Sequence, residues 1–247
     1  MWTPETITIV VFAFLCAGTV KGVIGLGIPT VSLGILAATL GLKDGMALML
    51  VPSIVTNIWQ GLVGGHFKIV TRRLWTLLAA ASVGSWFGTG LLAAADADVL
   101  IGLLGILLCV YSVVSLLTPQ IPPPGRHETW MSPVAGGVTG IIMGMTGTFF
   151  IPGILYMQAL GMPRDMLVQA MGVSFGIATV ALGVSLAGHG LLTVDLGLMS
   201  ATALAPAAVG MVIGQRLRKR LPENVFRRVF FSGLSVLGLY IVARSFM

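Results

Sequence analysis

Lys21 is the residue whose position points most directly to chemistry, because it lies about fifteen residues into an apolar segment. The other charged residues lie in or beside predicted loops, and no Asp or Glu lies inside an apolar segment to neutralise it. A lysine at the centre of a membrane helix costs about 2.5–3.5 kcal/mol on insertion scales. Three interpretations remain. The ammonium binds an anionic ligand, desolvation holds the amine neutral, or the side chain extends to an interface.

Two glycine-rich runs that end in proline interrupt apolar segments, at 21–29 and at 140–152. Glycine and proline loosen a helix, so we expect each run to join two short helices near the middle of the bilayer. The second helix of each pair would start near Pro29 or Pro152, with its free N–H groups and positive dipole end suited to an anion. The predicted substrate-binding residues in these runs are Lys21, Gly22, Gly25, Gly27, Thr30, Thr146, Gly147 and Thr148.

A second group of polar residues lies in neighbouring apolar segments. Ser53, Thr56, Asn57 and Gln60 recur at spacings that place them on one helical face. Such side chains either contact a ligand or bond adjacent helices, at about 0.6–2 kcal/mol each. The residues that we add to the predicted substrate site are Asn57, Gln60, Gln169 and Ser174.

Other features favour structural roles. Glycine pairs four residues apart, at 84/88, 172/176 and 210/214, are typical of tight helix packing. Cys16 and Cys109 lie in apolar segments without metal-ligand spacing, and His127 and His189 are expected in loops. No nucleophile–base pair or metal-ligand cluster lies within the segments, so we predict no enzymatic activity, no metal and no cofactor.

The composition identifies a multi-pass membrane protein. Of 247 residues, 56% are hydrophobic and 9% are charged, whereas soluble domains average about 25% charged residues. Several charge-free stretches approach or exceed the roughly 20 residues that a membrane-spanning helix needs. The formal charge of +6 is explained by basic cytoplasmic loops, and nucleic-acid binding is not expected.

The order of apolar blocks indicates a duplication. Four blocks precede a Pro-rich linker and four follow it, which predicts repeats at 1–117 and 131–247 joined by a cytoplasmic linker at 118–130. Short matches recur in the same order in both halves, at offsets that drift from 118 to 126 residues: Gly18 with Gly136, Leu40 with Leu160, Gly65 with Gly188, and Gly84 with Gly210.

The basic residues set the expected orientation. One cluster follows the second block of the first half (68–73), and another follows the third block of the second half (216–220). Placing both in the cytoplasm puts 11 of the 14 basic residues inside and two outside, with Lys21 left over. Equivalent loops then face opposite sides, with His66 inside and His189 outside. We therefore predict an all-α fold of two inverted repeats, each with a broken or re-entrant helical hairpin and three transmembrane helices.

At these residues the chain resembles the sulfite exporter TauE/SafE family, which includes 4-toluene sulfonate uptake permease-like membrane transporters. The resemblance rests on the doubled Gly-rich element followed by Pro (18–29 and 136–152), the Leu-Gly stretch after each, and the paired eight-block plan. It implies transport of a small sulfur-containing anion such as sulfite, thiosulfate or a sulfonate across the bacterial inner membrane.

The residues alone favour a small anion as well, because positive features and no carboxylates line the two breaks. The leading hypothesis is a secondary carrier that holds the anion at the breaks and works by alternating access. The alternatives are an anion channel and a carrier of another small organic anion. The sequence leaves open whether a proton or Na⁺ is co-transported.

Overall fold

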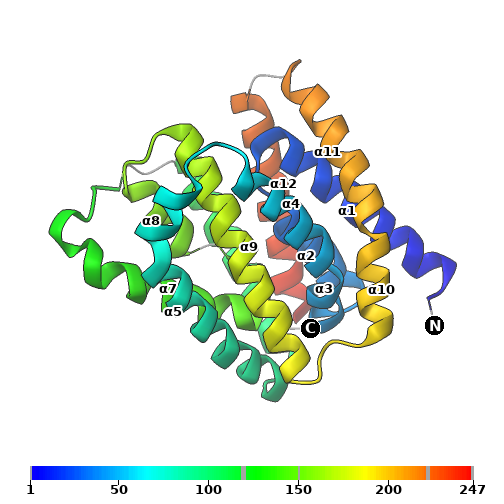
Figure 1. Cartoon of the computed structure of the whole chain (residues 1–247). Helices are drawn as coiled ribbons and strands as arrows, with labels where there is room; N and C mark the ends of the chain where they lie inside the picture. The colour runs from blue at the N-terminus through cyan, green and yellow to red at the C-terminus, as the bar shows by residue number, and fades with distance from the viewer. Residues whose placement is uncertain (1, 118–120, 150, 221–222, 246–247) are drawn as a thin grey trace. The chain divides into compact units, whose positions relative to one another are not determined.

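The computed structural model describes residues 2–117, 121–149, 151–220 and 223–245. Over these residues the regular secondary structure is entirely helical (Figure 1). The helices are α1 (Pro4–Ile24), α2 (Ile28–Thr39), α3 (Leu42–Leu48), α4 (Leu50–Leu62), α5 (Phe67–Ala94), α6 (Ala97–Leu117), the 3₁₀ turn η1 (Gly125–His127), α7 (Glu128–Thr146), α8 (Gly153–Ala159), α9 (Arg164–Gly188), α10 (Val194–Thr202), α11 (Leu204–Arg218) and α12 (Glu223–Ser245).

The helix lengths confirm a multi-pass membrane protein. Within the described residues, six spans are long and apolar enough to cross a bilayer, and a seventh is formed if the bent pair α3–α4 counts as one. The six spans are Pro4–Ile24, Phe67–Ala94, Asp98–Leu117, Arg164–Gly188, Val194–Arg218 (α10 and α11 together) and Val225–Ser245.

The chain folds into two compact units, and each unit draws on both halves of the sequence. Unit 1 comprises Met1–Pro52, Ala95–Thr118 and Thr193–Met247. Unit 2 comprises Ser53–Ala94 and Pro119–Leu192. The spatial units therefore differ from the predicted sequence repeats, because helices of one half pack against helices of the other.

In unit 1, α1 packs along α11 and α6 packs along α12. Glycines bring the α1 and α11 backbones together: a Cβ at Gly18 would lie 2.1 Å from the Ala207 carbonyl oxygen, and one at Gly22 would lie 2.3 Å from that of Met211. Both positions advance by four residues, so the two helices run parallel. The close contacts at Gly210 and Gly214 confirm the packing role predicted for that glycine pair.

Unit 2 contains a second parallel pair of the same kind, α5 and α7. A Cβ at Gly136 would lie 2.2 Å from the Leu77 carbonyl oxygen, and one at Gly140 would lie 2.1 Å from that of Ala81. At the start of this pair, Arg73 donates from Nε and Nη2 to the two carboxylate oxygens of Glu128, at 2.7 and 2.9 Å. These hydrogen bonds hold the pKa of the Glu128 carboxyl below its usual value.

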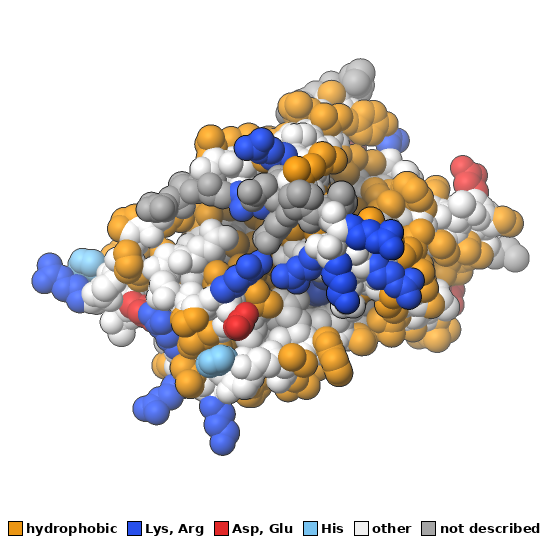
Figure 2. All heavy atoms as spheres, turned by 90° about the horizontal axis from the view of Figure 1, so that it is seen from above, with side chains coloured by type: hydrophobic (Ala, Val, Ile, Leu, Met, Phe, Trp, Pro, Cys, Tyr) orange, Lys and Arg blue, Asp and Glu red, His pale blue; other side chains and the backbone are white. Residues whose placement is uncertain are grey.

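The ends of several helices are basic. Arg216 and Arg218 lie in the last turn of α11, and Arg72 and Arg73 lie near the start of α5. Lys and Arg side chains lie at the surface in the view of Figure 2. Basic residues at helix ends are the pattern expected of cytoplasmic ends.

The interrupted segments differ from the expectation in the length of their first helices. Each break lies where the glycine-rich run predicted it, but α1 has 21 residues and α7 has 19, so neither is short. Helix α1 begins at an N-cap, where Thr3 accepts a hydrogen bond from the Thr6 N–H, and it stays helical through Lys21 up to Ile24. The loosening effect of glycine takes hold only at Gly25, which adopts the left-handed conformation.

A further break, between α3 and α4, was not predicted from the sequence. The two helices meet at a 44° bend, and Pro52 lacks the N–H that would bond the Leu48 carbonyl in a continuous helix. The buried Ser200 hydroxyl of α10 donates to the Leu48 carbonyl oxygen at 2.7 Å and accepts from the Val51 N–H at 3.0 Å. One side chain thus satisfies two backbone groups at the bend.

We predict that Ser200→Ala lowers the free energy of unfolding by about 1–3 kcal/mol, because it leaves those two buried groups unpaired. The double variant Pro52→Ala/Ser200→Ala should recover much of this loss, since the alanine that replaces the proline restores an N–H able to bond the Leu48 carbonyl. Thermal unfolding of Pro52→Ala, Ser200→Ala and the double variant in detergent measures the coupling. Additive effects of the two substitutions would contradict this account.

Candidate functional site

The break between α1 and α2 holds the first group of predicted site residues. Gly25 ends α1 with φ 79°, and its N–H bonds the Lys21 carbonyl oxygen at 2.8 Å. Gly27 then takes φ 138°, which side chains rarely adopt, and accepts the first bond of α2 from the Val31 N–H at 2.9 Å. Two closely spaced glycines with positive φ therefore turn the chain sharply between the helices.

Lys21 lies in the last turn of α1 and is 5% exposed. The break folds back onto this turn: a Cβ at Gly27 would lie 2.7 Å from the Val20 side chain and 3.4 Å from the Lys21 backbone nitrogen. The first turn of α2 is thereby held beside the last turn of α1. Thr30, also in that first turn, is 4% exposed. The burial of Lys21 argues against the interpretation that its side chain extends to an open interface.

The register of α1 on α11 gives the depth of Lys21. Since Gly18 faces Ala207 and Gly22 faces Met211, Lys21 is level with Gly210. Arg216 lies six residues further along α11, which corresponds to about 9 Å at 1.5 Å per residue. Lys21 is therefore level with a point four residues past the middle of the span Val194–Arg218 and six residues before Arg216.

Gly22 and Gly25, two glycines at this break, have different surroundings. Gly22 lies against α11, where the Met211 carbonyl oxygen and the Gly214 Cα would both lie within 3.0 Å of an added Cβ, so its small size serves packing. At Gly25 no atom would lie within 4 Å of an added Cβ. Gly25 therefore leaves its backbone approachable.

The break between α7 and α8 holds the second group. Gly147 ends α7 in the left-handed conformation (φ 73°), and its N–H bonds the Met143 carbonyl oxygen at 2.7 Å. Thr146 and Thr148 are fully buried, with their hydroxyl oxygens 2.9 Å apart. Because Thr146 donates to the Ile142 carbonyl at 2.7 Å, the Thr148 hydroxyl is the donor between the two threonines.

The second break, between α7 and α8, lies farther from the basic residues of its helix pair, Arg72 and Arg73 near the start of α5. Gly136 faces Leu77 and Gly144 faces Ser85, so Thr146 is level with Phe87. That level is fourteen residues beyond Arg73, or about 21 Å along the helix axis. The first break is near the basic end of its helix pair, and the second is near the opposite end of its own pair.

Gln60 and Gln169 connect α4 to α9. The buried Gln169 amide donates to the Gly61 carbonyl at 2.8 Å and accepts from the His66 N–H at 2.8 Å. Gln60 Nε2 donates to the Val168 carbonyl at 2.9 Å. Gln169 thereby satisfies a carbonyl at the end of α4 and an N–H just before α5, which is a role in positioning helices.

The remaining polar residues of the prediction are buried in unit 2. Ser174 is fully buried and its hydroxyl donates to the Met157 sulfur at 3.4 Å, which ties α9 to α8. Asn57 is 1% exposed and lines a groove of 340 Å³ between α4 and α9, beside Gly172 and Gly176. Ser53 and Thr56 are buried on the same helix.

The structure thus gathers Lys21, Gly25, Gly27 and Thr30 at one break and the threonines at another. It places the amide side chains at the α4–α9 contact. The sequence did not indicate the bidentate Arg73–Glu128 pair or the Ser200 bridge. Both join residues more than fifty positions apart, and only the helix register reveals their proximity.

Comparison with known proteins identifies the family. The model of the family described as Sulfite exporter TauE/SafE matches residues 10–241. The chain therefore belongs to this family of membrane transporters, as the resemblance indicated. No curated protein and no solved structure matches the chain.

The hydrogen bonds of Gln169 lead to a prediction that distinguishes a role in positioning helices from a role in binding the substrate. Gln169→Leu should lower the melting temperature in detergent, by an amount equivalent to about 1–3 kcal/mol, because it orphans two backbone groups. The exposed Gln158→Leu is the matched control and should unfold like the wild type. Unchanged stability of the Gln169→Leu protein, with loss of anion binding, would instead assign Gln169 to the substrate.

Proposed function

We propose that this TauE/SafE family member is a secondary transporter of a small, sulfur-containing anion such as sulfite, thiosulfate or a sulfonate. It works by alternating access in the bacterial inner membrane. The family supports a membrane transporter of anions. The identity of the anion and the alternating-access mechanism are what we propose in addition.

The burial of Lys21 carries the proposal. A lysine that is 5% exposed in the last turn of a membrane-spanning helix is costly to keep. Its position beside the first turn of α2 joins a cationic side chain to the positive end of a helix dipole. A small oxyanion is the substrate that both features attract.

The packing register supports inverted repeats as the basis of alternating access. The α1–α11 contacts at Gly18 and Gly22 correspond to the α7–α5 contacts at Gly136 and Gly140. Their partners on α11 and α5 differ by a constant 130 residues (207 against 77, 211 against 81). Applied to Gly84, this offset of 130 residues gives Gly214 as the equivalent position. The sequence match had paired Gly84 with Gly210, which is four residues, or about one helical turn, away.

The depths of the two breaks support the same proposal. The α1–α2 break lies close to the basic end of α11, whereas the α7–α8 break lies far from the basic residues at the start of α5. This difference is expected if equivalent elements point toward opposite sides of the membrane. A carrier of this kind exposes its site to each side in turn.

We predict that Lys21→Met lowers sulfite or thiosulfate flux in proteoliposomes by about tenfold or more, which corresponds to about 1.4 kcal/mol of lost stabilisation. The protein should still fold, because methionine keeps an unbranched side chain of similar length at this buried position. Lys43→Met, which removes a half-buried lysine at the start of α3, is the matched control and should retain flux. Wild-type flux from Lys21→Met would refute the role of Lys21.

The same proteoliposomes distinguish a carrier from a channel. A carrier should show saturable counterflow, in which unlabelled anion inside accelerates entry of labelled anion. Conductance that rises without saturation and without counterflow would contradict alternating access.

The inverted topology predicts opposite accessibility of two equivalent loops. In a background with Cys16 and Cys109 replaced by alanine, His66→Cys should react with a membrane-impermeant thiol reagent from the cytoplasmic side only. His189→Cys should react from the other side only. Reaction of both positions from one side would contradict inverted repeats, whatever the substrate.

A further inference from the structure

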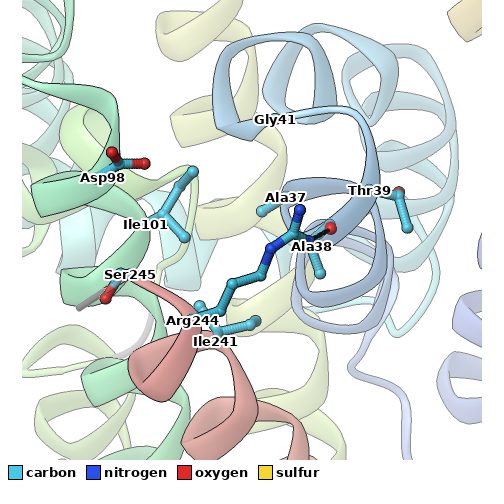
Figure 3. Close-up of a pocket in the computed structure, with 9 residues that line it drawn as sticks. All are labelled: Ala37, Ala38, Thr39, Gly41, Asp98, Ile101, Ile241, Arg244 and Ser245. Atoms are coloured by element: carbon cyan, nitrogen blue, oxygen red, sulfur yellow. Dashed lines mark hydrogen bonds between the residues drawn. The ribbon is translucent and has the colours of Figure 1, made fainter. Parts of the chain in front are cut away.

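A pocket of 190 Å³ lies in unit 1, where the ends of three helices meet (Figure 3). It is lined by the C-terminal end of α2 (Ala37, Ala38, Thr39), by Asp98 and Ile101 of α6, and by Arg244 and Ser245 of α12. Since α2 has 12 residues, this end is about 18 Å from the break that holds Lys21. The pocket is therefore separate from the proposed anion site.

The two charged residues of the pocket have opposite sign and come from different helices. Figure 3 shows Asp98 on α6 and Arg244 on α12, with Ile101 between them. Neither forms an ion pair with the other, since among the described side chains the pair within 4.0 Å is Arg73–Glu128. Arg244 instead donates from Nη1 to the Ala38 carbonyl oxygen at the end of α2. A guanidinium carries five N–H donors, so this bond leaves others for a ligand.

The hydroxyl groups of the pocket add acceptors. Thr39 donates its proton to the Ile35 carbonyl at 2.9 Å, and Ser245 donates to the Val242 carbonyl at 2.9 Å. Each hydroxyl therefore presents lone pairs to other groups. Together with the Asp98 carboxylate, the pocket offers acceptors suited to an ammonium group and one strong donor, Arg244, suited to an oxyanion.

The depth of the pocket indicates where such a ligand would come from. Asp98 begins the span Asp98–Leu117, and Ser245 ends the span Val225–Ser245. The ends of spanning helices lie at the headgroup layer of the bilayer. Val99 and Tyr240 follow and precede the pocket residues Asp98 and Ile241 in the sequence, and their large apolar side chains are 67% and 56% exposed and so available to lipid.

We infer that this pocket binds the headgroup of a phospholipid with a primary amine, phosphatidylethanolamine. Its ammonium group lies on Asp98 and its phosphate on Arg244. The volume of 190 Å³ equals that of about six water molecules, which suits a headgroup with two carbons between phosphate and amine. Free phosphoethanolamine has the same polar chemistry but lacks the acyl chains that would contact Val99 and Tyr240.

Lipid titration of the purified full chain in detergent tests this inference, with native mass spectrometry as the readout of binding. Phosphatidylethanolamine should bind about tenfold more tightly than phosphatidylcholine with the same acyl chains, because a quaternary ammonium has no N–H to donate to Asp98. Phosphatidylglycerol, which has no cation, should also bind more weakly than phosphatidylethanolamine. Phosphoethanolamine should bind more weakly than the intact lipid.

In Asp98→Asn, the ratio of the affinity for phosphatidylethanolamine to the affinity for phosphatidylcholine should fall close to one. The Asp98 side chain makes no hydrogen bond in the described part of the chain, so this variant should fold. Arg244→Gln should weaken both lipids. The ratio of the two affinities within each variant is unaffected by a general loss of stability.

The matched controls are Asp44→Asn and Lys43→Gln, which change charges outside the pocket and should keep the wild-type ratio. Equal binding of the two lipids by the wild type, or an unchanged preference in Asp98→Asn, would overturn the inference. Phosphoethanolamine binding as tightly as the lipid would show a water-soluble ligand and would overturn the lipid assignment.

Discussion

Backbone groups freed at helix breaks must be satisfied away from water, and this constraint governs the fold. At the α3–α4 bend, the Ser200 hydroxyl donates to the Leu48 carbonyl, for which Pro52 has no N–H, and accepts from the Val51 N–H. At the end of α2, Arg244 bonds a terminal carbonyl. At the α1–α2 break the chain instead turns through Gly25 and Gly27 and places Lys21 beside the start of α2. The first two breaks are completed by a side chain from another helix, and the third places a buried lysine beside a helix start.

Close helix contacts position the helices that precede the α1–α2 and α7–α8 breaks. The parallel pairs α1–α11 and α5–α7 approach so tightly that a single added Cβ at Gly18 or Gly140 would overlap a backbone carbonyl. In a bilayer such packing takes the place of the hydrophobic effect as the force between helices. The same contacts fix the register of each pair, and the register sets the depth of Lys21 and of Thr146. The packing glycines therefore set the depth at which the proposed binding element lies.

The sequence predicted the helical class, the membrane spans, the family and the position of both breaks, because hydropathy and Gly-Pro runs are local signals. It could not predict that α1 continues as a full span, since the left-handed turn at Gly25 and not the earlier Gly22 ends the helix. It also missed the α3–α4 bend, the Arg73–Glu128 pair and the engagement of Gln169, which depend on residues distant in the chain. Which helices of one half pack on helices of the other is likewise a property of the folded chain, and this is why the units differ from the repeats.

Anion binding to the purified protein tests the central claim, that the buried Lys21 ammonium attracts a small oxyanion. A panel of sulfite, thiosulfate, sulfate, sulfoacetate and taurine, read as shifts in melting temperature, ranks the ligands of the wild type and of Lys21→Met side by side. We expect sulfite or thiosulfate to raise the melting temperature of the wild type and to leave that of Lys21→Met unchanged. Equal shifts in the two proteins would contradict the claim.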